Sequence, residues 1–244
     1  MIKYEISMVD HAWINCANSV LFKGGKPDER TRIECYSYIL RDTESGDVVL
    51  VDTGVRDMDV LNSTVTAGGK WERVQDLLEV LQGMQISPED VSAVVLTHCH
   101  YDHASYAGAF ENAELVIGSR DIDFLYDKEK NGQYEKLAGL RKVVEEKKQN
   151  GRLIAVDDEF EYKGLCIVHA GGHTPGSQMV EANTQLGKCL LTGDAVFLVS
   201  FAKQGIPIGM SASPDEAEKA ALYCKSFNGM LLTGHDKDIK QIFS

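Results

Sequence analysis

Short apolar runs alternate with amphipathic stretches along most of the chain. Residues 35–40 and 47–52 are rich in apolar side chains, and the polar turn at 44–46 between them predicts a pair of strands. In residues 70–83 the apolar side chains recur at helical spacing, which predicts a helix that ends near Gly83. Further strands are predicted at 92–96, 113–118, 151–156, 160–164, 165–170, 177–182, 188–194 and 229–236, and further helices at 120–128, 133–148 and 213–227.

The last of these helices carries an N-terminal signature. Ser213 is the expected N-cap, Pro214 takes the first helical position, and Glu216 is expected to complete a capping box.

Each half of the chain supplies several strands followed by a helix. This order predicts an α/β fold in which two sheets pack together under outer helices. Because no low-complexity tract or Pro- or Ser-rich linker divides the chain, we expect one domain over residues 1–244.

The charge balance argues against two broad classes of partner. Asp and Glu number 37 against 25 Lys and Arg, which gives a formal net charge of −12. Without clustered basic residues, neither nucleic acid nor an anionic membrane surface is an expected partner. No apolar stretch approaches the roughly 18 residues that span a bilayer, and the N-terminus lacks the apolar region of a signal peptide. The 6 scattered cysteines include no CxxC pair, so we expect reduced thiols in a cytoplasmic protein.

Residues of metal-binding type lie at the ends of four predicted strands. The strand over 92–96 runs into THCHYDH at 97–103, and the other three lead to single His or Asp residues beside glycines. The candidate ligands are His98, His100, Asp102, His103, His173, Asp194 and His235. This set holds five of the 7 histidines in the chain, which argues against a purely structural origin.

The spacing of these residues suits two metal ions. Alternation in extended backbone directs His98 and His100 to the same side, where both can hold one ion. Asp102 and His103 begin the following turn and are expected to point toward a second ion. Cys99 should face away and pack in the core. Nitrogen and oxygen donors without cysteine suit Zn²⁺, Fe²⁺, Mn²⁺ or Co²⁺, so two divalent ions, with zinc favoured, are the expected cofactors.

Five motifs in order make the chain resemble the metallo-β-lactamase superfamily over nearly its whole length. These motifs are LVDTG at 50–54, THCHYDH at 97–103, GGHTPGS at 171–177, TGDA at 192–195 and TGHD at 233–236. The resemblance implies a four-layer αββα sandwich.

The resemblance also implies a role for each candidate ligand. One ion would be held by His98, His100 and His173, the other by Asp102, His103 and His235, and both by Asp194 as a bridge. Asp102 and Asp194 are the implied catalytic residues, because Asp102 can pass a proton to the leaving oxygen after attack by a metal-bridging hydroxide. Asp52 would orient the ligands. A simple turn residue before Gly54 is the alternative for Asp52.

Within the superfamily the chain most resembles the N-acyl homoserine lactonases. Residues 35–54 are arranged as in those enzymes, and residues 9–25 resemble the segment that lines their substrate pocket. The resemblance implies a hydrolase that opens a small lactone or a related ester, and family analogy favours a homodimer. The chain departs from the pattern at Phe197, where those enzymes carry Tyr, and at Ser177, which replaces a frequent His. A different carbonyl substrate therefore stays open.

Two other enzyme classes of the superfamily are alternatives. These are a thioesterase of the hydroxyacylglutathione hydrolase type and a mononuclear-iron enzyme of the persulfide-dioxygenase type. The full ligand set favours two ions over one, and it disfavours a non-catalytic binding protein. Alternative sources of the hydroxyl missing at position 197 are Tyr36, Tyr38, Tyr101 and Tyr106. Residues 197–210 with Trp13, Ile14 and Phe22 either hold an acyl chain or belong to the core.

Overall fold

The computed structural model describes residues 3–64, 69–127 and 138–243. The strands are β1 (Tyr4–Ala17), β2 (Arg30–Asp42), β3 (Val48–Val51), β4 (Glu72–Arg73), β5 (Val91–Val95), β6 (Glu114–Gly118), β7 (Leu153–Val156), β8 (Glu159–Tyr162), β9 (Leu165–His169), β10 (Gln178–Thr184), β11 (Gly187–Gly193) and β12 (Met230–Thr233). The α-helices are α1 (Asn18–Leu21), α2 (Met58–Thr64), α3 (Leu77–Gly83), α4 (Tyr101–Ala104), α5 (Ser119–Tyr126), α6 (Ala138–Gln149), α7 (Val199–Ala202) and α8 (Pro214–Ser226). No helix within these residues is long and apolar enough to cross a lipid bilayer.

Hydrogen bonds join the strands in one long path. The order is β12-β11-β10-β1-β2-β3-β5-β6-β7, with β9 beside β10, β8 beside β9 and β4 beside β1. Strand β1 pairs with β2 along its whole length, but it meets β10 only where Tyr4 lies opposite Thr184. This narrow link lets the two halves of the path lie face to face.

Several strands carry apolar side chains on both faces, so each sheet can pack against another layer on either side. Val49 and Val51 of β3 share one buried core with Val180 of β10 and Leu191 of β11. Since these strands come from the two halves of the path, their shared core fills the space between two sheets.

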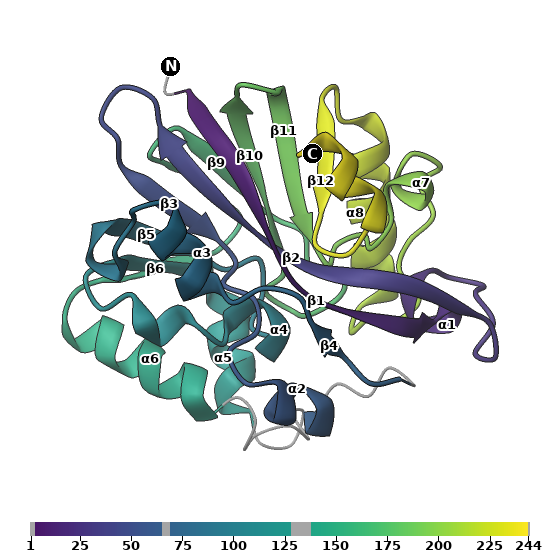
Figure 1. Cartoon of the computed structure of the whole chain (residues 1–244). Helices are drawn as coiled ribbons and strands as arrows, with labels where there is room; N and C mark the ends of the chain where they lie inside the picture. The colour runs from purple at the N-terminus through teal and green to yellow at the C-terminus, as the bar shows by residue number, and fades with distance from the viewer. Residues whose placement is uncertain (1–2, 65–68, 128–137, 244) are drawn as a thin grey trace.

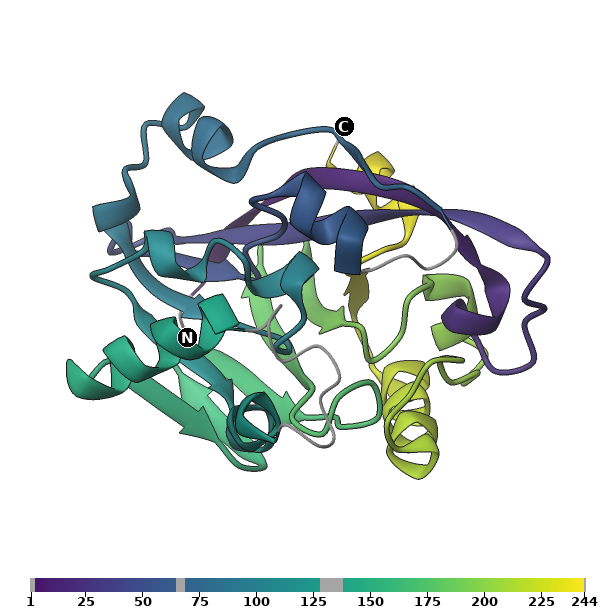
Figure 2. The same ribbon diagram turned by 90° about the horizontal axis from the view of Figure 1, so that it is seen from below.

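The outer face of each sheet is covered by helices (Figures 1 and 2). Leu50 of β3 shares a core with Leu81 of α3 and Leu140 of α6. Leu190 of β11 shares another with Ala221 of α8. The order helix, sheet, sheet, helix confirms the four-layer αββα sandwich.

The helix predicted over residues 70–83 is wrong in its first half. Helix α3 begins only at Leu77, because the side chain of Asp76 caps it by accepting hydrogen bonds from two N–H groups of the first turn. Residues 72–73 instead form β4, which pairs with β1. Val74, one of the apolar side chains that recur at helical spacing in residues 70–83, is 46% exposed. Tertiary pairing thus overrides the helical spacing.

The capping box predicted for α8 is also wrong. Ser213 and Pro214 do begin the helix, but the Ser213 side chain makes no capping hydrogen bond. Glu216 turns instead toward Gly172, whose N–H lies 3.3 Å from Oε2.

The long strand β1 was not predicted. For the helices predicted at 120–128 and 133–148, residues 128 and 133–137 lie outside the described residues.

Strand ends from both sheets lead into the candidate ligands. The parallel partners β3 and β5 end just before Asp52 and His98, and the parallel partners β11 and β12 end just before Asp194 and His235. Strand β9 leads into the loop that carries His173. The fold therefore presents the sequence motifs at one edge of the sandwich.

A buried lysine fastens α6 to the layer beneath it. Nζ of Lys147 donates hydrogen bonds to the carbonyls of Phe110, Glu111 and Ala113 at 2.7, 2.9 and 2.6 Å. These carbonyls precede β6, so the ammonium group satisfies backbone acceptors that the helix would otherwise cover.

We expect Lys147→Met to lower the free energy of unfolding by about 3 kcal/mol, because it leaves buried carbonyls without a donor. Urea unfolding followed by circular dichroism measures the change. Lys148→Met is the matched control, since Lys148 is exposed on the same helix turn. Equal stability of the two variants would contradict the anchoring role.

Candidate metal centre

The THCHYDH motif is held rigidly after β5. The N–H of Gln178 donates to the carbonyl of Thr97 at 2.8 Å, which ties the end of β5 to the start of β10. His100 is the N-cap of the short helix α4, and Asp102 and His103 lie on that helix. The turn from strand to helix therefore presents four polar side chains within six residues of chain.

The structure brings all the candidate ligands together. Three overlapping groups have their donor atoms within 4.8 Å of one another. The groups are His98 with His100 and His173, His98 with His103 and Asp194, and Asp102 with His103 and His235. The first group holds imidazoles alone and the third combines imidazoles with a carboxylate, while the group with Asp194 shares one histidine with each of them.

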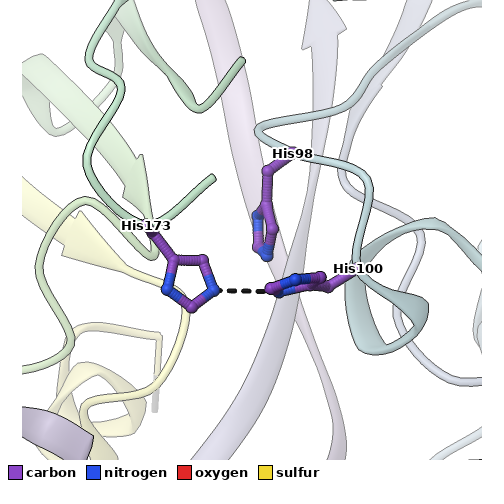
Figure 3. A group of neighbouring side chains, drawn as sticks. All are labelled: His98, His100 and His173. Atoms are coloured by element: carbon purple, nitrogen blue, oxygen red, sulfur yellow. Dashed lines mark hydrogen bonds between the residues drawn. The ribbon is translucent and has the colours of Figure 1, made fainter. Parts of the chain in front are cut away.

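The first site consists of imidazoles alone. Figure 3 shows His98, His100 and His173 converging, with His173 Nε2 2.9 Å from His100 Nδ1. His98 is completely buried, and its Nε2 has no hydrogen-bond partner among the described residues. Such an orphaned nitrogen is costly inside a protein unless a cation binds it.

The carboxylate of Asp194 lies between the two sites. Its Oδ2 faces the first site, 3.2 Å from His173 Nε2 and 3.7 Å from His98 Nε2. Its Oδ1 faces the second site, 3.0 Å from His235 Nε2 and 3.3 Å from His103 Nε2. Each oxygen thus addresses a different set of donors, which is the arrangement that a bridging ligand needs.

The second site combines imidazole and carboxylate donors. His103 Nε2 and His235 Nε2 lie 3.3 Å apart. Oδ2 of Asp102 is 3.6 Å from the first of these nitrogens and 3.9 Å from the second. A mixed nitrogen and oxygen set of this kind suits zinc and other divalent transition metals.

The outward ring nitrogens are fixed by oxygen acceptors. Nδ1 of His173 lies 3.2 Å from the Met210 carbonyl, and Nδ1 of His235 bonds the Glu34 carbonyl. A carbonyl only accepts hydrogen bonds, so both Nδ1 atoms carry a proton and both Nε2 atoms point inward. Without a proton or a cation between them, these nitrogens and the Asp194 carboxylate would repel one another. The donor set therefore fits a bound cation.

Asp52 performs the orienting role rather than that of a simple turn residue. Its Oδ2 lies 2.8 Å from Nδ1 of His103, and its two oxygens also accept hydrogen bonds from the N–H and hydroxyl of Thr97. Asp52 adopts a left-handed backbone conformation with φ of 60°. This strained conformation aims the carboxylate at both neighbours. Gly193 packs against Thr97, and only glycine fits there, since a Cβ at position 193 would lie 2.4 Å from Thr97 Oγ1.

The two sites differ in their affinity for protons. Burial opposes protonation of His103, but the carboxylates of Asp194, Asp102 and Asp52 outweigh it and hold its pKa well above the ordinary value. The pKa of His235 is likewise raised, by Asp194 against burial. At the first site burial lowers the pKa of His100 to about 3, helped by His173. Protons in the metal-free protein therefore collect at the second site.

Several other residues considered from the sequence lie away from the centre. Cys99 packs in the core beneath the helices, as predicted, and burial raises the pKa of its thiol. The hydroxyl of Ser177 accepts a hydrogen bond from the N–H of Thr174, so it shapes the loop of His173. The hydroxyl of Tyr38 donates to the Thr233 carbonyl.

Phe197, where the lactonases carry Tyr, packs directly on the ligand rings. Its ring centroid is 5.2 Å from that of His235 and 5.7 Å from that of His173. Tyr106 cannot supply a hydroxyl in its place, because that hydroxyl is bonded to Asp76. The wall beside the site is therefore apolar at this position.

Sequence reasoning missed three groups that build the site. The Glu34 and Met210 carbonyls escape any motif, because every residue carries a carbonyl. Asp121, which accepts the N–H of Cys99, lies outside the five motifs. A buried carboxylate in the first turn of a helix has no signature in one sequence.

Comparison with known proteins identifies the family of the chain. A family model of the metallo-beta-lactamase superfamily matches residues 30–226. The chain belongs to the metallo-β-lactamase superfamily, as its motifs indicated.

The similar proteins point to one branch of the superfamily. The chain is 28% identical over 199 residues to an N-acyl homoserine lactonase of a Bacillus species, with 78% of this chain and 72% of the relative covered. It is 24% identical over 177 residues to the lactonase AttM of Agrobacterium fabrum, covering 68% and 66%. The predicted resemblance to lactonases is confirmed.

Solved structures show the same fold. AiiA of B. thuringiensis, in a mutant with N-decanoyl-L-homoserine bound, superposes with a TM-score of 0.79 at 19% identity, covering 99% of this chain and 96% of that one. AidC, a dizinc quorum-quenching lactonase, gives a TM-score of 0.70 at 17% identity, covering 97% and 91%.

We expect Zn²⁺ binding to the metal-free protein at pH 7 to release about one proton per chain, because the surrounding carboxylates hold the pKa of His103 well above its ordinary value. The release should shrink as the pH rises through the raised pKa of His103. Calorimetric titration in buffers of different ionisation enthalpy measures it. His169→Gln, outside the site, should leave the release unchanged, whereas binding without proton release would refute the assignment.

Proposed function

We propose that this protein is a dinuclear-metal hydrolase that opens a lactone of the N-acyl homoserine type. The observation that carries the proposal is the Asp194 carboxylate, whose two oxygens face two separate donor groups. The lactonase relatives and the confirmed superfamily support the same activity.

The first ion would be held by His98, His100 and His173, the second by Asp102, His103 and His235, and both by Asp194. Ions bound at these residues would lower the pKa of a shared water and polarise the substrate carbonyl. Zinc is the first choice, as the dizinc relative AidC suggests.

Asp102 is the residue proposed to move the proton. Its carboxylate lies at the second donor group, 3.6 Å from His103 Nε2, and is buried. From there it would accept the proton of the attacking water and deliver it to the ring oxygen as the ester bond breaks. The product would be a single N-acyl homoserine, which carries both the new carboxylic acid and the new alcohol.

The apolar rim beside His173 is the proposed seat of the acyl chain. Phe22 and Phe201 stack with ring centroids 4.0 Å apart, and Met210, whose carbonyl contacts His173, is 46% exposed. The N–H of Met210 donates to the carbonyl of Val20, which holds this rim to α1. Ile14, in contrast, is fully buried and belongs to the core.

We expect zinc-loaded protein to release acid from a medium-chain N-acyl homoserine lactone in a pH-stat assay. Asp194→Ala should lower kcat/KM about 1,000-fold, because it removes the carboxylate between the two donor groups. Asp158→Ala is the control, since its side chain is 80% exposed. No acid release from protein shown to hold two ions would reject this substrate and redirect the search to other esters and thioesters.

We expect Phe197→Tyr to raise kcat on the same lactone about tenfold with little change in KM, because it adds a hydrogen-bond donor beside the reacting carbonyl. Steady-state kinetics measures both constants. Phe201→Tyr is the matched control, since it adds a hydroxyl to the apolar rim instead. A lower kcat in Phe197→Tyr would show that the phenyl ring suits a different substrate.

A further inference from the structure

Asp121 is a fully buried carboxylate that ties two loops together. It lies in the first turn of α5 with 0% of its surface exposed. Its Oδ2 accepts the N–H of Cys99 at 2.8 Å, and its Oδ1 accepts the N–H of Gly176 at 2.7 Å. Each oxygen therefore holds a different segment of the chain, and the two segments are separated by more than seventy residues.

Both segments carry ligands of the first site. Cys99 lies between His98 and His100, and Gly176 lies in the turn from Thr174 to Ser177 that directly follows His173. We propose that Asp121 is the positioning residue that assembles the His98, His100 and His173 site, an inference that rests on the proposed function. The carboxylate touches none of these imidazoles in the hydrogen bonds that it makes, so it acts through the backbone that carries them.

The close approach of α5 to the loop supports a dedicated role. A Cβ on Gly118 would lie 2.2 Å from the Gly176 carbonyl oxygen, and a Cβ on Gly176 would lie 2.3 Å from the Asp121 nitrogen. Only glycine at both positions lets the first turn of α5 reach the backbone between the ligands. The contact therefore needs Gly118, Asp121 and Gly176. Of these three residues, only Gly176 lies in one of the five motifs.

Burying a carboxylate here has an energetic cost. Burial raises the pKa of Asp121, and the hydroxyl of Thr174 and the two N–H groups oppose that rise. An apolar side chain would fill the space without this cost but would leave two backbone N–H groups without an acceptor. The carboxylate is the small group that can serve both loops at once, one oxygen to each.

Asp121→Asn is the sharpest test because it keeps the size of the side chain. The amide has one oxygen, so it can accept only one of the two N–H groups and turns its NH₂ toward the other. We expect the affinity for one of two zinc ions to fall about 10–100-fold, as for other residues that support metal ligands, with the second ion unaffected. Titration against a competing chelator gives both dissociation constants.

Cadmium NMR identifies the weakened site. The first site, which is the all-histidine site of His98, His100 and His173, and the second site should give separate cadmium resonances. Asp121→Asn should lose the resonance of the all-histidine site first. Asp42→Ala is the control, because Asp42 is also buried and accepts two backbone N–H groups, but at the turn after β2. That variant should lower the melting temperature and leave both metal affinities unchanged.

The possible results separate this inference from the proposed function. Wild-type affinity for both ions in Asp121→Asn, or equal weakening of both ions, would overturn the positioning role even if the protein opens lactones. Selective loss at the all-histidine site would establish that role even if the substrate proves to be another ester. A wild-type protein that binds no divalent metal would overturn both.

Discussion

A single buried carboxylate sets the constraint on which the site depends. Asp194 lies with one oxygen toward Nε2 of His173 and the other toward Nε2 of His235, and neutral rings would point lone pairs at it. Those rings cannot turn away, because the Met210 and Glu34 carbonyls hold their outer N–H groups. Only protons or metal ions relieve the repulsion. The surrounding backbone therefore fixes a cation site, and the side chains alone do not.

The position of this carboxylate couples the site to the core between the sheets. Asp194 follows β11 in one sheet, whereas His98 and His103 follow β5 in the other. Each donor group combines residues from both sheets, so the distances between its ligands depend on how closely the sheets pack. Val51, which directly precedes Asp52, and Leu191, a few residues before Asp194, lie in that shared core. A cavity there would move the ligands apart as well as lower stability.

The sequence could predict what local patterns encode. Strand ends followed by His or Asp predicted the candidate ligands, and alternation of His98, Cys99 and His100 predicted which side chains face inward. Prediction from the sequence failed where contact with a residue distant in the chain decides the local structure. Residues 72–73 form a strand because β1 lies beside them, and Glu216 leaves its helix end to contact Gly172. Carbonyl acceptors such as that of Met210 are invisible in any pattern of side-chain types.

The same distinction separates the chemistry of the site from its choice of substrate. Membership of the superfamily leaves the substrate open, because one fold can host many substrates. Selectivity must arise from the wall that surrounds the donors. That wall is apolar at Phe197, which packs against His173 and His235, and at Phe22 and Phe201. An apolar wall favours substrates that bury hydrocarbon next to the reacting carbonyl, which is what an acyl chain offers.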